Sequence, residues 1–307
     1  MTVTMGHRRL ATPVGAVVIL LWSSSFAVAR SLTEQLGALR ASSYACLLGG
    51  ILGMVYLAAW GGGLGRLRRL SWRRQAGRGA FFVAYEVCML LATGLSASRQ
   101  QVLEVGIINY LWPGLTLLLS VPVLGHRAKW TLLPGIAIAF TGVVLAATQE
   151  GFSLKTIGGR SASLPPYLLA LAGAFCWAFY TNLSRKWTQQ GDQAAVPLFI
   201  LAAGAVLAVG IAFAGESSRW SPRAGAELAY MAAFPIGIAM LLWNFAVRHG
   251  NVAMLASLSH LTPLLSTGVS CLYLRVVPAG ELWLACALVI GGAVMCRLSV
   301  LSPAAEG

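Results

Sequence analysis

Long apolar stretches, separated by short segments with polar and charged residues, run along the whole chain of 307 residues. Each stretch has roughly 17 to 21 residues, and an α-helix of this length is long enough to cross a hydrocarbon core about 30 Å thick. The pattern therefore predicts transmembrane helices. The ten stretches cover residues 13–30, 41–60, 79–97, 103–122, 131–148, 166–183, 194–214, 227–246, 252–272 and 282–299.

The composition agrees with a membrane protein. Hydrophobic residues make up 58% of the chain and charged residues only 10%, whereas an average soluble domain has about 25% charged residues. The net charge of +13 would suggest a nucleic-acid partner if the protein were soluble. Here the basic residues lie between the apolar stretches, so we expect the lipid bilayer as the partner and no nucleic acid.

The distribution of basic residues predicts the orientation of the chain. If the N-terminus is cytoplasmic and the chain crosses ten times, 14 of the 22 Lys and Arg residues lie on the cytoplasmic side. The excess comes mainly from RLRRLSWRRQAGR at residues 66–78. Because cytoplasmic loops are enriched in Lys and Arg, we expect both termini to be cytoplasmic.

The first stretch has an alternative interpretation as a secretory signal peptide. HRR at residues 7–9 precedes it, and AVA at residues 27–29 resembles a small-residue cleavage site. Nine further apolar stretches follow, which favours a retained transmembrane helix.

Weak internal similarity divides the chain into two halves. Pro113 aligns with Pro263 at an offset of 150 residues, and Trp22 aligns with Trp177 at an offset of 155. Because five crossings are an odd number, the second half would be inverted relative to the first. The predicted fold is an all-α membrane protein with ten transmembrane helices, arranged as two inverted five-helix repeats around a central cavity. The first repeat covers residues 1–150, a polar linker covers 151–165, and the second repeat covers 166–307.

Two prolines interrupt the fourth and ninth stretches at membrane depth. Pro113, within INYLWPGL at residues 108–115, lies nine residues past Glu104, or about 13 Å at ~1.5 Å per residue, and Pro263 lies at a similar depth counted from Asn251. Because proline has no N–H, the carbonyl of Asn109 or Ser259, four residues earlier, loses its helical partner. Such backbone is tolerated where it lines a cavity or is satisfied by neighbours. We therefore predict helix breaks at the midplane that act as hinges.

Polar and aromatic side chains near these prolines predict a substrate-binding site. Asn109, Trp112 and Thr116 share one face of the fourth stretch, and His260 lies at the edge of a hydroxyl stripe on the ninth. An alternative role for the hydroxyl groups is to join helices by hydrogen bonds. The candidate binding residues are Trp22, Tyr85, Glu86, Asn109, Trp112, Trp177, Trp243 and His260, and the candidate hinges are Pro113 and Pro263.

Glu86 is the only acidic residue that the pattern places deep inside an apolar stretch. It lies eight residues past Arg78, or about 12 Å along a helix at ~1.5 Å per residue. A carboxyl group at this depth could take part in proton coupling or bind the ammonium group of a substrate. The competing interpretation is a structural hydrogen bond, or a protonated group without a role.

Recognised motifs for catalysis and ATP use are absent. The sequence has no GxxxxGK phosphate-binding loop, no HExxH motif and no complete GxSxG motif, so we expect no catalytic residues, no cofactor and no metal. The six cysteines form no CxxC pair, and we expect them to act as small hydrophobic residues. The competing class is a membrane-embedded enzyme in which Glu86 and His260 perform acid–base chemistry.

Several features together resemble the EamA type of the drug/metabolite transporter superfamily. They are the two halves of five stretches, the tryptophans near the middle of the first and sixth, the proline-bearing fourth and ninth, and Glu281 at the start of the last. NYLWP at residues 109–113 resembles the fourth helix of the YddG-type aromatic amino acid exporters. The resemblance implies an inner-membrane exporter of small metabolites, with a central cavity between helices 3, 4, 8 and 9 that opens alternately to either side. Thr131 departs from the pattern, since it stands where Glu281 stands in the second half.

The side chains at the midplane favour a zwitterionic substrate. No Lys or Arg lies there, so a substrate carboxylate would meet neutral donors such as Asn109, His260 and indole N–H groups. Aromatic walls could stack an aromatic side chain or hold an ammonium group by a cation–π attraction of roughly 0.5 to 2 kcal/mol. Such walls also suit hydrophobic drugs, so a multidrug or other-metabolite carrier of the same fold is a second alternative. The oligomeric state and coupling to protons stay open.

Overall fold

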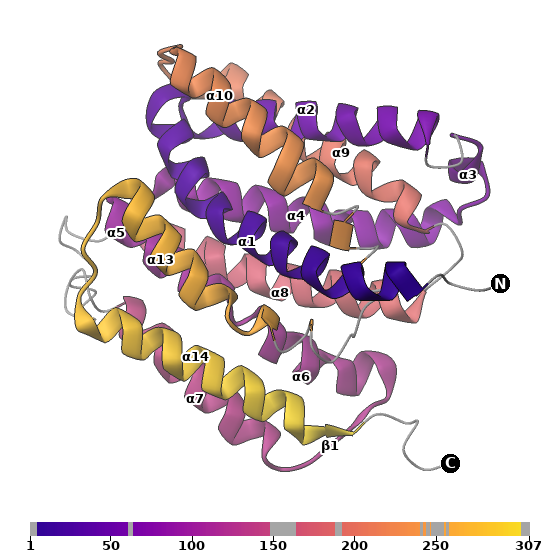
Figure 1. Ribbon diagram of the computed structural model, residues 1–307, viewed down its shortest axis with the longest axis vertical. Coiled ribbons are helices and arrows are strands. Elements are labelled where there is room, and N and C mark those ends of the chain that lie inside the picture. Colours follow the sequence, from indigo (N-terminus) through magenta and orange to yellow (C-terminus); the bar gives the residue numbers. More distant parts are fainter. Residues whose placement is uncertain are drawn as a thin grey trace.

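The computed structural model describes residues 5–60, 64–147, 164–187, 192–239, 242–243, 246, 255 and 258–301. In this part of the chain the fold is a bundle of helices with one two-stranded ribbon (Figure 1). Seven helical segments are long and apolar enough to cross a membrane, and two further apolar helices are shorter. The predicted all-α membrane protein is therefore confirmed.

The helices follow one another in the same order as the predicted stretches. The first half contains α1 (Met5–Leu36), α2 (Ala38–Ala59), α3 (Gly65–Arg68), α4 (Trp72–Leu95), α5 (Arg99–Asn109), α6 (Trp112–Leu124) and α7 (Leu132–Ala147). The second half contains α8 (Leu164–Lys186), the 3₁₀-helix η2 (Asp192–Ala195), α9 (Val196–Ala214), α10 (Pro222–Met231), the π-helix η3 (Ala232–Ile238), α13 (Thr262–Leu274) and α14 (Gly280–Ser299). The ribbon is formed by β1 (Arg127–Ala128) and β2 (Val300–Leu301).

Seven of the ten predicted stretches correspond to the seven long helical segments. These are Leu10–Leu36, Ala38–Ala59, Trp72–Leu95, Arg99–Leu124, Leu164–Lys186, Val196–Phe213 and Gly280–Ser299. The stretch at 131–148 corresponds to the shorter helix α7. The stretch at 227–246 covers the end of α10 and η3, and the one at 252–272 covers most of α13, while its first part lies largely outside the described residues.

Several helices extend beyond the predicted boundaries. α1 continues to Leu36 rather than ending at residue 30, and α4 begins at Trp72 rather than residue 79. An apolar stretch ends at the first charged side chain, whereas helical hydrogen bonds continue into polar end turns. α1 also belongs to the core of the bundle, since Ala27 and Leu32 are buried and the helix packs against α13. This packing favours a retained helix over a signal peptide.

The last helices of the two halves, α7 and α14, pack closely and antiparallel through glycines. A Cβ atom on Gly142 would lie 2.8 Å from the carbonyl oxygen of Ala285, and one on Gly292 would lie 2.5 Å from that of Gly135. The contacting residue numbers fall along α14 as they rise along α7, so the two helices run in opposite directions, side by side in Figure 1. The backbones approach this closely because these positions carry no side chain.

The second helices of the two halves, α2 and α9, form a similar pair. A Cβ atom on Gly50 would lie 3.0 Å from the backbone nitrogen of Leu201, and one on Gly204 would lie 2.9 Å from that of Leu47. The Ser43 hydroxyl also donates a hydrogen bond to the Gly204 carbonyl at 2.9 Å. Two closely packed, antiparallel helix pairs therefore frame the bundle.

The six cysteines carry free thiols. Cys46, Cys286 and Cys296 are buried, and Cys296 packs against the glycine surface of α7 at Gly135. These three positions therefore act as the small hydrophobic residues that were predicted.

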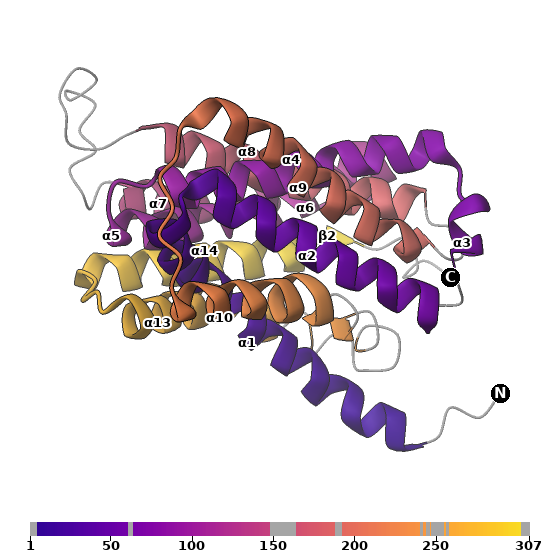
Figure 2. The same ribbon diagram turned by 90° about the horizontal axis from the view of Figure 1, so that it is seen from above.

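The two ends of the bundle differ in the segments that they contain. The beginning of α1, the helix α3 and the β1–β2 ribbon lie at one end, and the beginning of α5 lies at the other (Figures 1 and 2). Next to the ribbon, the Lys129 N–H donates to the Ser299 carbonyl at 2.7 Å, and the hydroxyls of Thr131 and Ser299 are 2.7 Å apart. Thr131 therefore joins the start of α7 to the end of α14.

We predict that Gly292→Ala destabilises the protein and that its neighbour Gly291→Ala does not. The methyl group at 292 would meet backbone atoms of α7, and overpacking of this kind costs about 1–3 kcal/mol. At 291 a Cβ atom meets nothing within 4 Å, and replacing Gly by Ala in a helix favours folding by up to about 1 kcal/mol. Thermal melting in detergent measures both effects. Equal melting temperatures for the two variants would contradict the packing described here.

Candidate functional site

Both proline-bearing helices are interrupted, at positions 150 residues apart. In the first half α5 ends at Asn109 and α6 begins at Trp112, and the Leu111 N–H in the turn between them donates to the Ile108 carbonyl at 3.1 Å. In the second half the Leu261 N–H donates to the Leu258 carbonyl at 2.9 Å, and α13 begins at the next residue. The helices are therefore interrupted where breaks were predicted, and their role as hinges stays a prediction.

The prolines lie just after the breaks rather than within them. Pro113 and Pro263 each occupy the first turn of the helix that follows, α6 and α13. A helix's first N–H groups have no intrahelical partner, so proline loses no hydrogen bond there, and its fixed φ favours the start of a helix. In the span Arg99–Leu124 the break falls at the centre, which places it at the middle of a membrane of matching thickness.

The two breaks line one small pocket against α14. Each break contributes its proline and neighbouring side chains, and α14 contributes apolar residues. The Nε2 atom of His260 is buried and has no hydrogen-bond partner among the described residues. The pocket thus holds an unpaired polar group beside aromatic and apolar walls. Its lining residues are Tyr110, Trp112, Pro113, Ser259, His260, Pro263, Val289, Ile290 and Ala293.

An aromatic cluster lies next to this pocket and shares Trp112 with it. Its centre is Trp177 on α8, whose ring centroid lies 4.6 Å from that of Tyr85, 5.3 Å from that of Tyr180 and 6.3 Å from that of Trp112. Phe82, one turn before Tyr85 on α4, adds a ring 6.2 Å from Trp177. Sequence reasoning identified Tyr85, Trp112 and Trp177 but missed Phe82 and Tyr180. Phe82 lies three residues before Tyr85, and Tyr180 lies three residues after Trp177, so each pair shares one helix face. This spacing was the signal in the sequence that could have identified them.

Asn109 and Glu86 lie at the edge of this aromatic cluster. Asn109 is buried at the end of α5, its side chain interacts with Tyr85, and its Oδ1 atom has no hydrogen-bond partner among the described residues. Glu86 follows Tyr85 on α4, is half-buried, and lies close enough to Cys46 of α2 to interact with it electrostatically. A polar edge therefore borders the aromatic surface.

Trp22 and Trp243 form a separate pair. Their ring centroids are 5.3 Å apart, and the Trp22 indole N–H donates to the Pro235 carbonyl of η3 at 3.2 Å. Trp22 was aligned with Trp177 by the internal similarity, but Trp177 belongs to the cluster on α4, α6 and α8. The predicted site residues are thus distributed over three groups, of which the pocket and the aromatic cluster share Trp112.

Glu86 is not the only acidic residue inside a described span. α5 begins at Arg99, so Glu104 lies inside the helix, where it is fully buried and accepts a hydrogen bond from the Tyr167 hydroxyl of α8. The apolar stretch was expected to begin at residue 103, but side-chain hydrogen bonds to the backbone fix an earlier helix start. The Ser98 hydroxyl accepts a hydrogen bond from the Gln101 N–H at 2.9 Å, and Gln101 Oε1 accepts one from the Ala97 N–H at 2.8 Å. This reciprocal pair resembles a capping box and marks the start of α5.

Comparisons with known proteins agree with this architecture. The family model described as the EamA-like transporter family matches residues 11–148 and again residues 164–298. The chain is 31% identical to the aromatic amino acid exporter YddG of Salmonella typhimurium, over 94% of this chain and 97% of that protein. It is 33% identical to the protein of the same name from Ancylobacter novellus, over 95% and 98% of the two chains.

A solved crystal structure is also similar to this chain. The two chains are 29% identical and superimpose with a TM-score of 0.68, over 94% of this chain and 98% of the other. The two ranges matched by the family model cover both halves of the bundle and include both interrupted helices. The chain therefore belongs to the EamA-like transporter family, a family of membrane transporters.

Proposed function

We propose that the protein is a secondary transporter that exports amino acids, aromatic and other neutral ones, and related small metabolites across the bacterial inner membrane by alternating access. The observation that carries this proposal is the pocket between two interrupted helices, which borders an aromatic cluster through Trp112. Relatives that match nearly the whole chain are named aromatic amino acid exporters, which supports the substrate class.

Symmetric glycine contacts support the proposal of two inverted repeats, at residues 1–150 and 166–307. Under the offset of 150, Gly142 corresponds to Gly292 (142 + 150) and Ala285 corresponds to Gly135 (285 − 150). The contact between Gly142 and Ala285 thus becomes the contact between Gly292 and Gly135, and both occur. A relation that exchanges two antiparallel helices is a two-fold rotation about an axis perpendicular to them, which in a membrane lies in its plane.

The α2–α9 pair obeys the same rule. With an offset of 154, Gly50 corresponds to Gly204 (50 + 154) and Leu201 corresponds to Leu47 (201 − 154), and both resulting contacts occur. The twofold match of the family model is consistent with this division. Inverted repeats allow one half to adopt the conformation of the other, which exchanges an outward-open cavity for an inward-open one.

The neutral polar groups near the midplane favour zwitterions over anions. The residues that line the pocket include no Lys or Arg, so a carboxylate would meet the Asn109 amide, His260 and indole N–H groups. The aromatic cluster offers faces for stacking or for a substrate ammonium. A multidrug carrier would use the same walls, and a transport screen over amino acids and hydrophobic cations separates the two.

The enzyme hypothesis has less support. Glu86 interacts with Cys46 and Tyr85, whereas His260 lines the pocket against α14. Acid–base chemistry would require both groups to reach one substrate atom at hydrogen-bond distance. A carrier needs no such convergence.

We predict that both termini face the cytoplasm. The basic segment at 66–78 and the start of α1 lie at the same end of the bundle, which the distribution of Lys and Arg assigns to the cytoplasm. In a cysteine-free background, an impermeant thiol reagent added to intact cells should label Ser217→Cys, an exposed position at the other end, and leave Arg69→Cys unlabelled. The opposite pattern would reverse the orientation.

We predict that Glu86→Gln changes the transport rate without abolishing transport. Apolar surroundings favour the uncharged form of a carboxyl group, and Gln resembles that form in shape and charge. We expect a loss of less than about tenfold, equivalent to ~1.4 kcal/mol, in counterflow by proteoliposomes on both sides of neutral pH. Glu281→Gln, at an exposed helix start, is the matched control. Complete loss in folded Glu86→Gln protein would instead indicate obligatory proton coupling.

We predict that Pro113→Ala and Pro263→Ala slow exchange more than they reduce stability. Alanine supplies the N–H that can bond to the carbonyl of Asn109 or Ser259, so the two half-helices can join into one stiffer helix. Counterflow should fall severalfold, most in the double variant, while the melting temperature should stay near that of the parent, since alanine is the better helix former.

Pro122→Ala is the control for the hinge, because Pro122 lies inside α6 away from the break. Substrate affinity, counterflow rate and melting in detergent are measured together for all variants. Unchanged exchange in the double variant would show that the prolines only fix static bends.

A further inference from the structure

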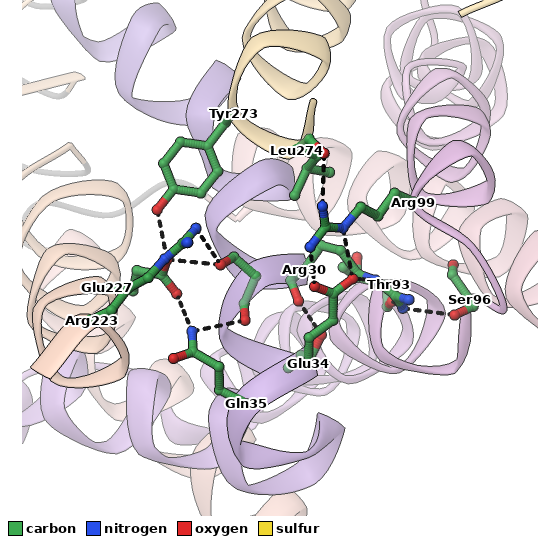
Figure 3. Close-up of polar contacts among 12 residues, drawn as sticks. Arg30, Glu34, Gln35, Thr93, Ser96, Arg99, Arg223, Glu227, Tyr273 and Leu274 are labelled. Carbon is green, nitrogen blue, oxygen red and sulfur yellow. Dashed lines mark hydrogen bonds and ion pairs between the residues drawn. The ribbon is translucent and has the colours of Figure 1, made fainter. Parts of the chain in front are cut away.

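Two clusters of charged and polar side chains join the helix ends at the end of the bundle opposite α3. In the first cluster, Arg99 at the start of α5 binds Glu34 of α1 through two nitrogens, Nε at 3.0 Å and Nη2 at 2.6 Å (Figure 3). Arg30 Nε also donates to Glu34 at 2.9 Å. The remaining nitrogens reach further helices, since Arg99 Nη1 donates to the Leu274 carbonyl of α13 at 2.8 Å and Arg30 Nη1 donates to the carbonyl that follows α4, at Ser96.

The second cluster surrounds a buried carboxylate on α10. Glu227 is only 5% exposed, and its Oε1 atom accepts hydrogen bonds from Arg223 Nε at 2.7 Å, the Tyr273 hydroxyl at 2.7 Å and the Ser31 hydroxyl at 2.8 Å. Its Oε2 atom accepts from Gln35 Nε2 at 2.9 Å. Donors from α1, α10 and α13 thus satisfy one carboxylate (Figure 3). A buried charge needs such a set, because each missing partner leaves it desolvated and unpaired.

Together the clusters tie helices of the first half to helices of the second. α1, α4 and α5 belong to the first half, and α10 and α13 belong to the second. α5 runs from Arg99 in the network to the break after Asn109, and α13 runs from the break before Thr262 to Leu274 in the network. The two half-helices that end at the breaks are therefore the ones that the network holds together.

Below the network, buried polar side chains lead from this end toward the breaks. Ser270, one turn before Tyr273 on α13, is buried and lines a narrow space with Phe26, Tyr110 and Ser266. Tyr110 belongs both to this space and to the pocket between the breaks. Tyr110 thus places this narrow space between the pocket and the end of the bundle that carries the network.

We propose that this network is the closed outer gate of the transporter, and that release of substrate to the outside requires Glu34 to lose Arg99 of α5 and Glu227 to lose Tyr273 of α13. The proposal rests on the alternating access and the orientation proposed above. Opening would separate α5 and α13, with their breaks as pivots, from α1 and α10. The polar groups of the network would then be hydrated by the water that enters.

Labelling of a buried reporter tests the gate without any substrate. Ser270→Cys, as the only cysteine, should react slowly with an impermeant maleimide in right-side-out vesicles when the network is intact. Adding Glu34→Gln and Glu227→Gln should speed the reaction by about tenfold or more, since the variant weakens the closed state and shifts the population toward the open one. Unchanged labelling in folded double-variant protein would overturn the proposal.

Glu216→Gln is the matched control. Glu216 is a carboxylate at the same end, but it accepts hydrogen bonds from the N–H groups of Leu39 and Arg40 at the start of α2 and does not bridge the gate helices. Its replacement should leave the labelling rate of Ser270→Cys unchanged. If labelling becomes faster only in inside-out vesicles, the orientation is wrong and the gate lies on the cytoplasmic side, so the two failures can be distinguished.

Cross-linking gives a second test that keeps both glutamates. The Arg223 guanidinium carbon of α10 lies 5.6 Å from the centroid of the Tyr273 ring of α13, so Arg223→Cys and Tyr273→Cys should be bridged by oxidation or a short bis-maleimide. The oxidative bridge should stop counterflow, and reduction should restore it, while Arg223→Cys alone should be unaffected by oxidant. Full counterflow in bridged protein would contradict a gate at this position.

Discussion

The need to satisfy backbone hydrogen bonds inside the membrane governs the helices that carry the site. In hydrocarbon, each peptide group without a partner is costly, so an interrupted helix persists only where its turn is satisfied locally or lines a polar space. The turn after α5 meets this need because Leu111 bonds back to Ile108, and the proline that follows contributes no donor. The span Arg99–Leu124 therefore consists of two helices, α5 and α6, joined by a turn, and α13 begins at the matching break. The pocket, the aromatic cluster and the network at the helix ends are all arranged around these two breaks.

The rest of the bundle supplies the rigid frame against which such pieces can move. α7 packs on α14, and α2 packs on α9, through glycines whose backbones lie in direct contact with the partner helix. Because the backbones are already in direct contact, these two interfaces cannot shift by small amounts without a steric clash. The helices around the pocket contact one another through larger side chains such as Trp112 and Trp177, which can change rotamer. Close backbone contacts and contacts through large side chains thus fall on different helices.

Sequence reasoning found the features that depend on local chemistry and missed those that depend on which helix ends meet. Pro113 and Pro263 predicted the breaks because proline alters its own helix. Tyr85, Trp112 and Trp177 were recognised as aromatic residues deep in apolar stretches, and they do form one cluster. Glu227 and Glu34 were not recognised, because their partners on α1, α5 and α13 are distant in the sequence.

A polar network at a helix end suits a gate better than an apolar seal does. When an apolar seal opens, it exposes surface at about 25 cal/mol per Å², so each cycle would meet a large penalty. When the contacts of Glu34 and Glu227 open, water replaces the lost donors, and the net value of a hydrogen bond exchanged in this way is only about 0.5–1.5 kcal/mol. While closed, Glu227 keeps four specific donors that fix the register of α1, α10 and α13. The arrangement therefore holds one definite closed state and still permits an open state of similar free energy, and alternating access requires both.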